Sequence, residues 1–183
     1  MSLIPRLFSR RKSRSVLIGL DGVPYTLLQN LIAKGVTPNL AKVAAAGPAH
    51  FKQMDATLPE ISSVSWSSFM TGVNPAKHGI YGFMDLKPGT YQMYFPSYPH
   101  LKAEPIWDKL GRQGKRSVVI NMPGTYPARP HEGVLISGFV AIDLKKAVYP
   151  PTILPALEGM GYRIDVDTSK GADADHLYKD LAL

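Results

Sequence analysis

The chain alternates between short, nearly continuous apolar runs and longer stretches in which apolar residues recur at helical spacing. The runs Ser15–Leu20 and Ser117–Met122 predict strands buried on both faces, as in a parallel sheet. Val134–Phe139 predicts a third strand, and the alternating polarity of Tyr162–Val166 predicts a fourth.

The stretches between these runs predict helices, several of which carry the usual end signals. Pro24 opens the first of them, and Gly35 follows its end. Thr37 suits the cap of the second. Thr71–Phe83 is rich in glycine and predicts a loop instead. The predicted helices are Tyr25–Ala33, Asn39–Ala46, Ser62–Met70, Pro105–Gln113, Pro151–Met160 and Asp173–Leu181.

Strands that alternate with helices imply right-handed crossovers. The predicted fold class is therefore α/β, with a largely parallel sheet and helices on both faces. The last predicted helix runs into Leu183 without a glycine, a proline or another stop signal. We therefore expect this fold to be incomplete in the chain as given.

Composition limits the chemistry that the chain can support. Its 183 residues fit one domain, and its hydrophobic content of 45% is that of an ordinary soluble protein. It contains no cysteine, which excludes disulfides and thiolate metal sites. Any metal must therefore be bound by oxygen and imidazole ligands.

Positive charge is concentrated at the amino terminus. Five of the 21 basic residues precede the first acidic residue, Asp21, and the other 16 are nearly balanced by 14 acidic residues. We expect residues 1–14 to form a basic, disordered arm and residues 15–183 to form the domain. Such an arm could contact anionic lipid or nucleic acid, but a solvated tail is the simpler reading, and no specific nucleic-acid binding is expected.

The sequence does not suggest a membrane protein. No segment approaches the roughly 20 apolar residues that span a bilayer, so no transmembrane segment is expected. The first eight residues are too short and too interrupted to be the apolar core of a signal peptide. We therefore expect a cytoplasmic protein, and no pattern specifies its oligomeric state.

Asp21 directly follows the first predicted strand. In open α/β sheets, sites form beyond the carboxyl ends of strands, where rigid backbone can aim a carboxylate at a metal. Asp21 and Gly22 equally suit an ordinary turn. The residues alone leave both interpretations open, and the turn is the simpler one.

Ser62 lies at the start of a predicted helix, where backbone N–H groups and the helix dipole favour a bound phosphate. A hydroxyl there can attack phosphorus when a metal lowers its pKa. A serine at this position is also commonly an N-cap. Spacing does not single out the reactive member of the cluster Ser62, Ser63, Ser65, Ser67 and Ser68.

Two segments carry a resemblance to a known family. V-L-I-G-L-D-G, which includes Asp21, and P-E-I-S-S-V-S-W-S-S-F-M-T-G-V-N-P-A-K-H-G-I-Y-G-F, from Pro59 to Phe83, resemble the alkaline phosphatase superfamily. They are most similar to its type I phosphodiesterase/nucleotide pyrophosphatase branch, and especially to a predicted phosphohydrolase/phosphomutase group. Further similarities, such as V-V-I-N-M-P-G-T-Y-P, extend the resemblance over roughly residues 15–170.

The resemblance implies roles for specific residues. The strand-end aspartate of the family falls on Asp21. Its nucleophile lies nine positions before Thr71 and so falls on Ser62, with Ser63 as the alternative if the register slips by one. Asp21 and Ser62 would bind one of two divalent metal ions, usually zinc and in some relatives manganese. The implied reaction is in-line attack on a small-molecule phosphate ester, followed by hydrolysis of the phosphoserine.

The sequence departs from this family in two respects. Nucleotide pyrophosphatases commonly have an asparagine where this chain has Phe83, so their specificity is not expected here. The remaining aspartate and histidine ligands of the family lie in its carboxyl-terminal half. Here only Asp175-His176 offers such a pair, and we interpret it as solvated helix surface. His78 is expected to order its loop through hydrogen bonds.

The chain is thus predicted to supply the nucleophile half of a metal-dependent phosphoric ester hydrolase, a phosphodiesterase or phosphohydrolase. One carboxylate and one serine cannot hold two metals tightly, so the isolated chain is expected to be inactive or weakly active. The alternative is a non-catalytic remnant that binds an anionic partner through its basic arm, with strong salt dependence. Asn121 and Tyr126 could line the crevice, and packing is an equally good interpretation of both.

Overall fold

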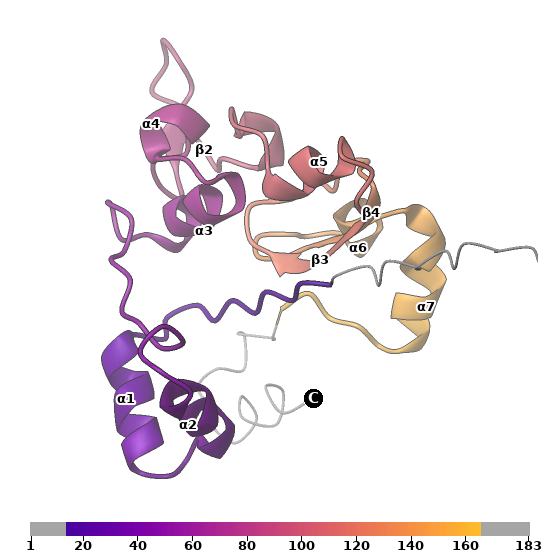
Figure 1. The fold of residues 1–183 in the computed structure, drawn as a ribbon. Coiled ribbons are helices and arrows are strands. Elements are labelled where there is room, and N and C mark those ends of the chain that lie inside the picture. The colour runs from indigo at the N-terminus through magenta and orange to yellow at the C-terminus, as the bar shows by residue number, and fades with distance from the viewer. Residues whose placement is uncertain (1–13, 166–183) are drawn as a thin grey trace, which may run out of the picture. The chain divides into compact units, whose positions relative to one another are not determined.

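The computed structural model describes residues 14–165. The chain divides into two compact units, Met1–Met54 and Asp55–Leu183, and each is described by itself. Figure 1 draws the first unit in indigo to violet and the second in magenta to yellow. Ser62 belongs to the second unit, so the fold of that unit determines its surroundings.

The described part of the first unit contains the helices α1 (Tyr25–Ala33) and α2 (Pro38–Ala45). The α1 helix has the predicted bounds, and Gly35 follows it in a left-handed conformation with φ of +71°. The α2 helix is shifted by one residue from its prediction. The ring of Tyr25 stacks on Phe51 with a centroid distance of 4.7 Å and so ties α1 to the segment after α2.

The predicted strand Ser15–Leu20 is wrong for the structure as described, because these residues form no strand. Their apolar side chains are exposed, from 63% for Leu20 to 84% for Val16. A parallel strand exists only through hydrogen bonds to a neighbouring strand, and residues 14–54 contain no strand that could pair with this run. An apolar run without a neighbour therefore remains extended and unpaired within this unit.

The second unit begins with α3 (Ser62–Thr71) and the short helix α4 (Pro75–His78). A two-stranded antiparallel hairpin of β1 (Asp85–Leu86) and β2 (Met93–Tyr94) follows. The helix α3 matches its prediction and extends one residue further.

The α4 helix lies inside the stretch that was predicted to be a loop. Asn74 caps it, since its side chain accepts a hydrogen bond from the Lys77 N–H at 3.3 Å, and Pro75 occupies the first turn. Gly79 then ends it with φ of +78°. The start and stop signals of this helix are the ordinary ones, but only one helical turn separates them. In so short a segment the glycine content favoured a loop prediction.

A mixed sheet follows, with the strand order β3-β4-β5. The β3 and β4 strands pair in parallel, and β4 and β5 pair antiparallel. The connection 123–132 between β3 and β4 contains no helix. The mixed α/β class agrees with the prediction, but the largely parallel sheet is not confirmed, because one of the two strand pairs in this sheet is parallel and the other antiparallel. The elements of this region are η1 (Tyr98–His100), α5 (Ile106–Gly111), β3 (Ser117–Met122), β4 (Gly133–Ser137), α6 (Leu144–Ala147), β5 (Val148–Tyr149), η2 (Pro151–Ile153) and α7 (Leu154–Gly159).

Helices cover both faces of β4, as expected from the alternation of elements. Leu135 is fully buried on one face, in a cluster with Met70 of α3 and Trp107 of α5. Ile136 points to the opposite face and packs with Leu157 of α7. Figure 1 shows α5 and α7 on either side of the paired strands. The alternation of neighbouring residues along one strand thus places them in two separate cores.

The prediction that β3 is buried on both faces is wrong for the described residues. Val118 and Ile120 are 69% and 59% exposed, whereas Val119 packs in the cluster of Trp107. The helices α6 and α7 cover β4 and β5 on the second face but leave β3 bare. The strand predicted at Tyr162–Val166 is also absent from its described part, residues 162–165.

Several expectations fall on residues outside the described range. They are the basic arm except for Arg14, the final helix Asp173–Leu181, and the Asp175-His176 pair within it. Within residues 14–165, no helix is long and apolar enough to cross a membrane.

Candidate active site

Ser62 is the first residue of α3, and the residue before it provides the N-cap. That residue is Ile61, whose extended backbone (φ −121°, ψ 132°) turns the chain into the helix. Its carbonyl accepts hydrogen bonds from the N–H groups of Val64 and Ser65, both at 2.9 Å. An isoleucine side chain cannot cap N–H groups, so the interpretation of Ser62 as an ordinary N-cap is wrong.

The other end of α3 is held by two features. Gly72 has φ of +69°, and its N–H donates to the carbonyl of Ser68 at 2.8 Å, which closes the helix. The ammonium of Lys109, from α5, donates to the carbonyl of Thr71 at 3.4 Å. A cation at this end complements the negative pole of the helix dipole. The axis of α3, and hence the position of Ser62, is fixed against α5.

His78 connects the loop after α4 to the middle of α3. Its side chain is fully buried, and its Nε2 lies 2.9 Å from the Oγ of Ser68. The backbone N–H of Ile80 donates to His78 Nδ1 at 3.1 Å. Because Nδ1 accepts a hydrogen bond, the proton of the neutral ring sits on Nε2, which donates to Ser68. The expectation that His78 orders its loop through hydrogen bonds is confirmed.

Acidification is expected to destabilise the second unit through His78. Burial lowers the pKa of His78 from its usual 6.5, so the unfolded chain binds a proton before the folded chain does. The stability it contributes is complete above pH 6.5 and declines, by at most about 1.4 kcal/mol per pH unit, as the pH falls toward the folded-state pKa. Urea unfolding across this range in the chain and in His78→Gln measures the effect.

The glutamine variant should show a flatter loss of stability below pH 6.5, since it has no proton to bind there. His50→Gln is the control for the loss of an exposed histidine elsewhere in the chain. An unchanged slope in His78→Gln would contradict this assignment.

Ser63, the alternative nucleophile, has a different environment from that of an open catalytic hydroxyl. Its Oγ is buried, and no hydrogen-bond partner for it occurs among residues 14–165. As whole residues, Ser62 and Ser63 are both half-buried at the beginning of the helix, so the difference lies in the buried Oγ of Ser63. In-line attack requires an open approach to the oxygen, which an enclosed hydroxyl does not offer.

Asp21 forms a turn with Gly22, which has φ of +65°. The turn interpretation of this pair is thus correct for its local structure, and a carboxylate on a turn can still bind a metal. Asp21 belongs to the unit Met1–Met54 and Ser62 to the unit Asp55–Leu183. Their joint role at a metal therefore stays a prediction.

The carboxyl ends of β3 and β4 carry the other residues considered for the crevice. Asn121 precedes the last residue of β3 and has φ of +55°, and its Oδ1 accepts a hydrogen bond from the Tyr162 hydroxyl at 2.5 Å. Just after β4, the ring of Phe139 meets Phe83 edge to face, with centroids 6.1 Å apart. Both phenylalanines are about half exposed, at 50% and 42%. An aromatic pair therefore stands at this end of the sheet.

Sequence reasoning missed the residues that hold α3 in place. Sequence spacing does not distinguish Ser68 from the other four serines of its cluster, and only the structure shows its hydrogen bond with His78. Lys109 was one exposed helix residue among many, although it reaches the end of α3. No local pattern marks either contact, because each joins residues 10 or 38 positions apart.

The metal ligands expected from the resemblance are only partly present in the described chain. Residues 14–165 contain no group of three or more histidine, aspartate or glutamate side chains that could hold a metal ion. The carboxylate of Asp21 and the hydroxyl of Ser62 are oxygen donors of the kind that zinc and manganese accept. By their chemistry, the two residues would fit part of a coordination shell.

Comparison with known families decides the assignment. The family described as type I phosphodiesterase / nucleotide pyrophosphatase matches residues 15–179. The chain belongs to this family. The match covers Asp21, Ser62 and the His78 loop together, so the local structure described above is that of a type I phosphodiesterase/nucleotide pyrophosphatase segment.

A curated relative agrees with the family match. It is described as an uncharacterized pyrophosphatase/phosphodiesterase of Schizosaccharomyces pombe, and it is 30% identical over 121 residues. The alignment covers 62% of this chain and 24% of the relative, so the chain spans about a quarter of the length of that relative. No solved structure matches the chain.

Proposed function

We propose that the chain contributes the nucleophile for phosphate ester hydrolysis, and that Ser62 is this nucleophile. Family membership supports the class of reaction. The observation that carries the choice of residue is the place of Ser62 in the first turn of α3, after an apolar N-cap. A phosphate at this end would meet backbone N–H groups and the positive pole of the helix dipole.

In the proposed reaction, Ser62 Oγ attacks phosphorus in line with the departing ester oxygen. The bond between Oγ and phosphorus forms as the bond to the leaving alcohol breaks, and the serine proton passes to solvent. Water then attacks the phosphoserine, which releases phosphate or a phosphomonoester and restores the hydroxyl. The buried Oγ of Ser63 supports the assignment to Ser62.

We propose Asp21 and Ser62 as ligands of one of two divalent cations, zinc or manganese. When bound, such cations lower the pKa of a coordinated hydroxyl and neutralise charge on the phosphoryl oxygens. Asp21 would hold its cation with its carboxylate, from a turn at the surface of its unit. The remaining ligands lie outside the described residues in this proposal.

Phe83 supports a phosphohydrolase specificity over a nucleotide pyrophosphatase specificity. A phenyl ring cannot donate a hydrogen bond to a phosphoryl oxygen, and here it packs edge to face against Phe139. The pair places apolar surface at the carboxyl end of β4. The proposed substrates are therefore phosphate esters whose leaving group does not need to be a nucleotide.

The half-site part of this proposal predicts weak or absent activity for residues 1–183 alone. Hydrolysis of bis(p-nitrophenyl) phosphate with added zinc or manganese should stay near the rate of the metal in buffer, because two oxygen donors bind metals weakly. The longest gene product that contains residues 1–183 should show metal-dependent hydrolysis under the same conditions. A metal-dependent enzymatic rate in residues 1–183 alone would contradict the proposal that this chain supplies only part of the active site. If both proteins lack such a rate, the proposed reaction class is wrong.

A further inference from the structure

Residues of the β1–β2 hairpin, of the loop after α4 and of the segment around η1 line an open concave region of the unit Asp55–Leu183. Its volume is about 670 Å³, within the range of small-molecule sites. Aromatic and basic side chains dominate its lining, namely those of Tyr81, Lys87, Tyr94, Phe95, His100 and Lys102. None of these residues takes part in the reaction proposed for Ser62.

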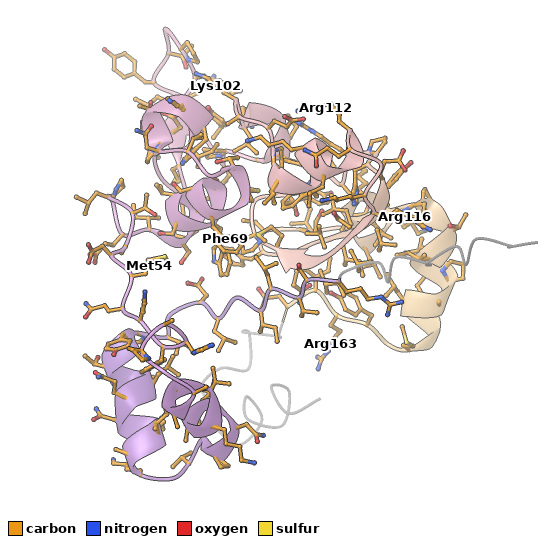
Figure 2. The ribbon with its side chains drawn as sticks, viewed as in Figure 1. Met54, Phe69, Lys102, Arg112, Arg116 and Arg163 are labelled. Carbon is orange, nitrogen blue, oxygen red and sulfur yellow. The ribbon has the colours of Figure 1, made fainter. Side chains whose placement is uncertain are left out.

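Lys102 supplies a directed positive charge to this cavity. Its side-chain stem lies over Gly79, where a Cβ atom would approach Lys102 Cδ to 2.8 Å. The backbone N–H of Lys102 donates to the carbonyl of His78 at 2.9 Å, which fixes the start of the side chain. Figure 2 shows Lys102 beside α4, the helix that Gly79 ends. The glycine therefore gives the lysine room to lie along the cavity wall.

His100 offers a hydrogen-bond donor to the same cavity. Its Nδ1 accepts from the backbone N–H of Ser97 at 3.1 Å, so the proton of the neutral ring is on Nε2. The ring of Tyr94 packs against the imidazole with a centroid distance of 4.7 Å. These two contacts fix the ring and leave Nε2 as its donor.

Asp85, the acidic residue of the lining, is already engaged. Its Oδ1 accepts from the backbone N–H of Leu86 at 2.8 Å, and its Oδ2 accepts from the Tyr94 hydroxyl at 3.4 Å. Lys87 contributes a second ammonium, held loosely by Gln92 at 3.5 Å. The donors that remain for a ligand are thus mainly cationic.

The apolar part of the lining consists of exposed aromatic rings. Tyr81 is 54% exposed and Phe95 is 62% exposed, so both offer ring surface to a ligand. Aromatic faces next to ammonium groups suit a planar ring that carries an anionic group.

We propose that this cavity binds a small anion that carries an aromatic ring, such as an aryl phosphate or phosphonate. The anionic group pairs with Lys102, Lys87 and the Nε2 donor of His100, and the ring stacks on Tyr81 or Phe95. No residue of α3, the helix that carries Ser62, lines this region, so the proposed binding goes beyond the proposed hydrolysis.

Phenylphosphonate is a suitable probe, because its carbon–phosphorus bond is not an ester, and a chelator removes metal sites from the measurement. Isothermal titration of residues 1–183 with phenylphosphonate, in the presence of EDTA, should show saturable binding with a Kd of about 1 mM, as expected for a ligand of this size. Methylphosphonate, which lacks the ring, and benzyl alcohol, which lacks the charge, should each bind about tenfold more weakly or worse. Equal binding of either control, or no saturation by about 20 mM, would overturn the proposal.

Lys102→Gln keeps most of the stem over Gly79 and removes the charge. It should weaken phenylphosphonate binding about three- to fivefold, the scale of an exposed charge pair. Lys115→Gln is the matched control, since Lys115 is exposed and does not line the cavity. Because it removes a charge away from the ligand, it should change binding by less than about twofold. Equal losses of affinity in the two lysine variants would mean non-specific charge attraction and would overturn the proposal. A third variant, Ser62→Ala, should bind phenylphosphonate as the unmutated chain does. Loss of binding in Ser62→Ala would assign the ligand to Ser62 and would also overturn the proposal.

Discussion

Replacing Ser62 by alanine in the longest gene product that contains residues 1–183 is expected to lower kcat by at least about 10³-fold. The reason is that the neighbouring hydroxyl, that of Ser63, is buried and so cannot take over the attack at the start of α3. Steady-state hydrolysis of bis(p-nitrophenyl) phosphate at saturating metal measures this loss. Acid quench of the unmutated protein with a radiolabelled phosphate ester should also trap label on Ser62.

Ser63→Ala is the matched control on the next residue. It removes a buried oxygen for which residues 14–165 provide no hydrogen-bond partner, so neither packing nor polar contacts should suffer much. We expect its kcat to stay within about threefold of the unmutated protein. If Ser63→Ala loses activity and Ser62→Ala retains it, the register is off by one residue and the nucleophile is Ser63.

Trp107→Ala is expected to destabilise the second unit by about 3–5 kcal/mol. Trp107 is 3% exposed and packs with Met70, Tyr98 and Leu135. Its Nε1 donates to the Tyr98 hydroxyl at 3.0 Å, and burial raises the pKa of Tyr98 to about 12. Truncation would leave a cavity and a buried hydroxyl without its donor, so two costs add. The free energy of unfolding in urea measures the sum.

The adjacent residue on α5 provides the control for this change. Ile106 is 52% exposed, so Ile106→Ala should cost less than about 1 kcal/mol, although it removes a side chain from the same helix. Trp107→Phe, which keeps an aromatic ring but loses the donor, should fall between the two. A loss below about 1 kcal/mol for Trp107→Ala would mean that this cluster is not the core of the unit.

Local patterns predicted the elements whose signals lie within their own residues. The helix Tyr25–Ala33 and the strand Ser117–Met122 have the predicted bounds, because a proline start, a glycine end or an apolar run defined them. The run Ser15–Leu20 is as rich in apolar residues as Ser117–Met122 but forms no strand as described. The difference is the presence of a partner strand, which no window of local sequence contains.

The candidate site shows the same division between local and distant information. Ser62 at the start of a helix followed from pattern, and its role followed from resemblance to the family. The pattern could not tell that Ile61 occupies the N-cap, because serine is preferred at that position and isoleucine is disfavoured. It also could not show that Ser68 is the partner of His78, because tertiary packing decides that pairing.

The hydrogen bond between Ser68 and His78 also limits how this part of the chain can change in length. It closes a loop of fixed span through Gly72 and Asn74, whose ends are set by α3 and α4. An extra residue there would pull the imidazole away from Ser68 and disturb the helix that carries Ser62. The tip of the β1–β2 hairpin around Gly89 is exposed and carries no such contact to α3, so we expect insertions to be tolerated there. The number of residues between Ser68 and His78, in contrast, is fixed by the hydrogen bond that joins them.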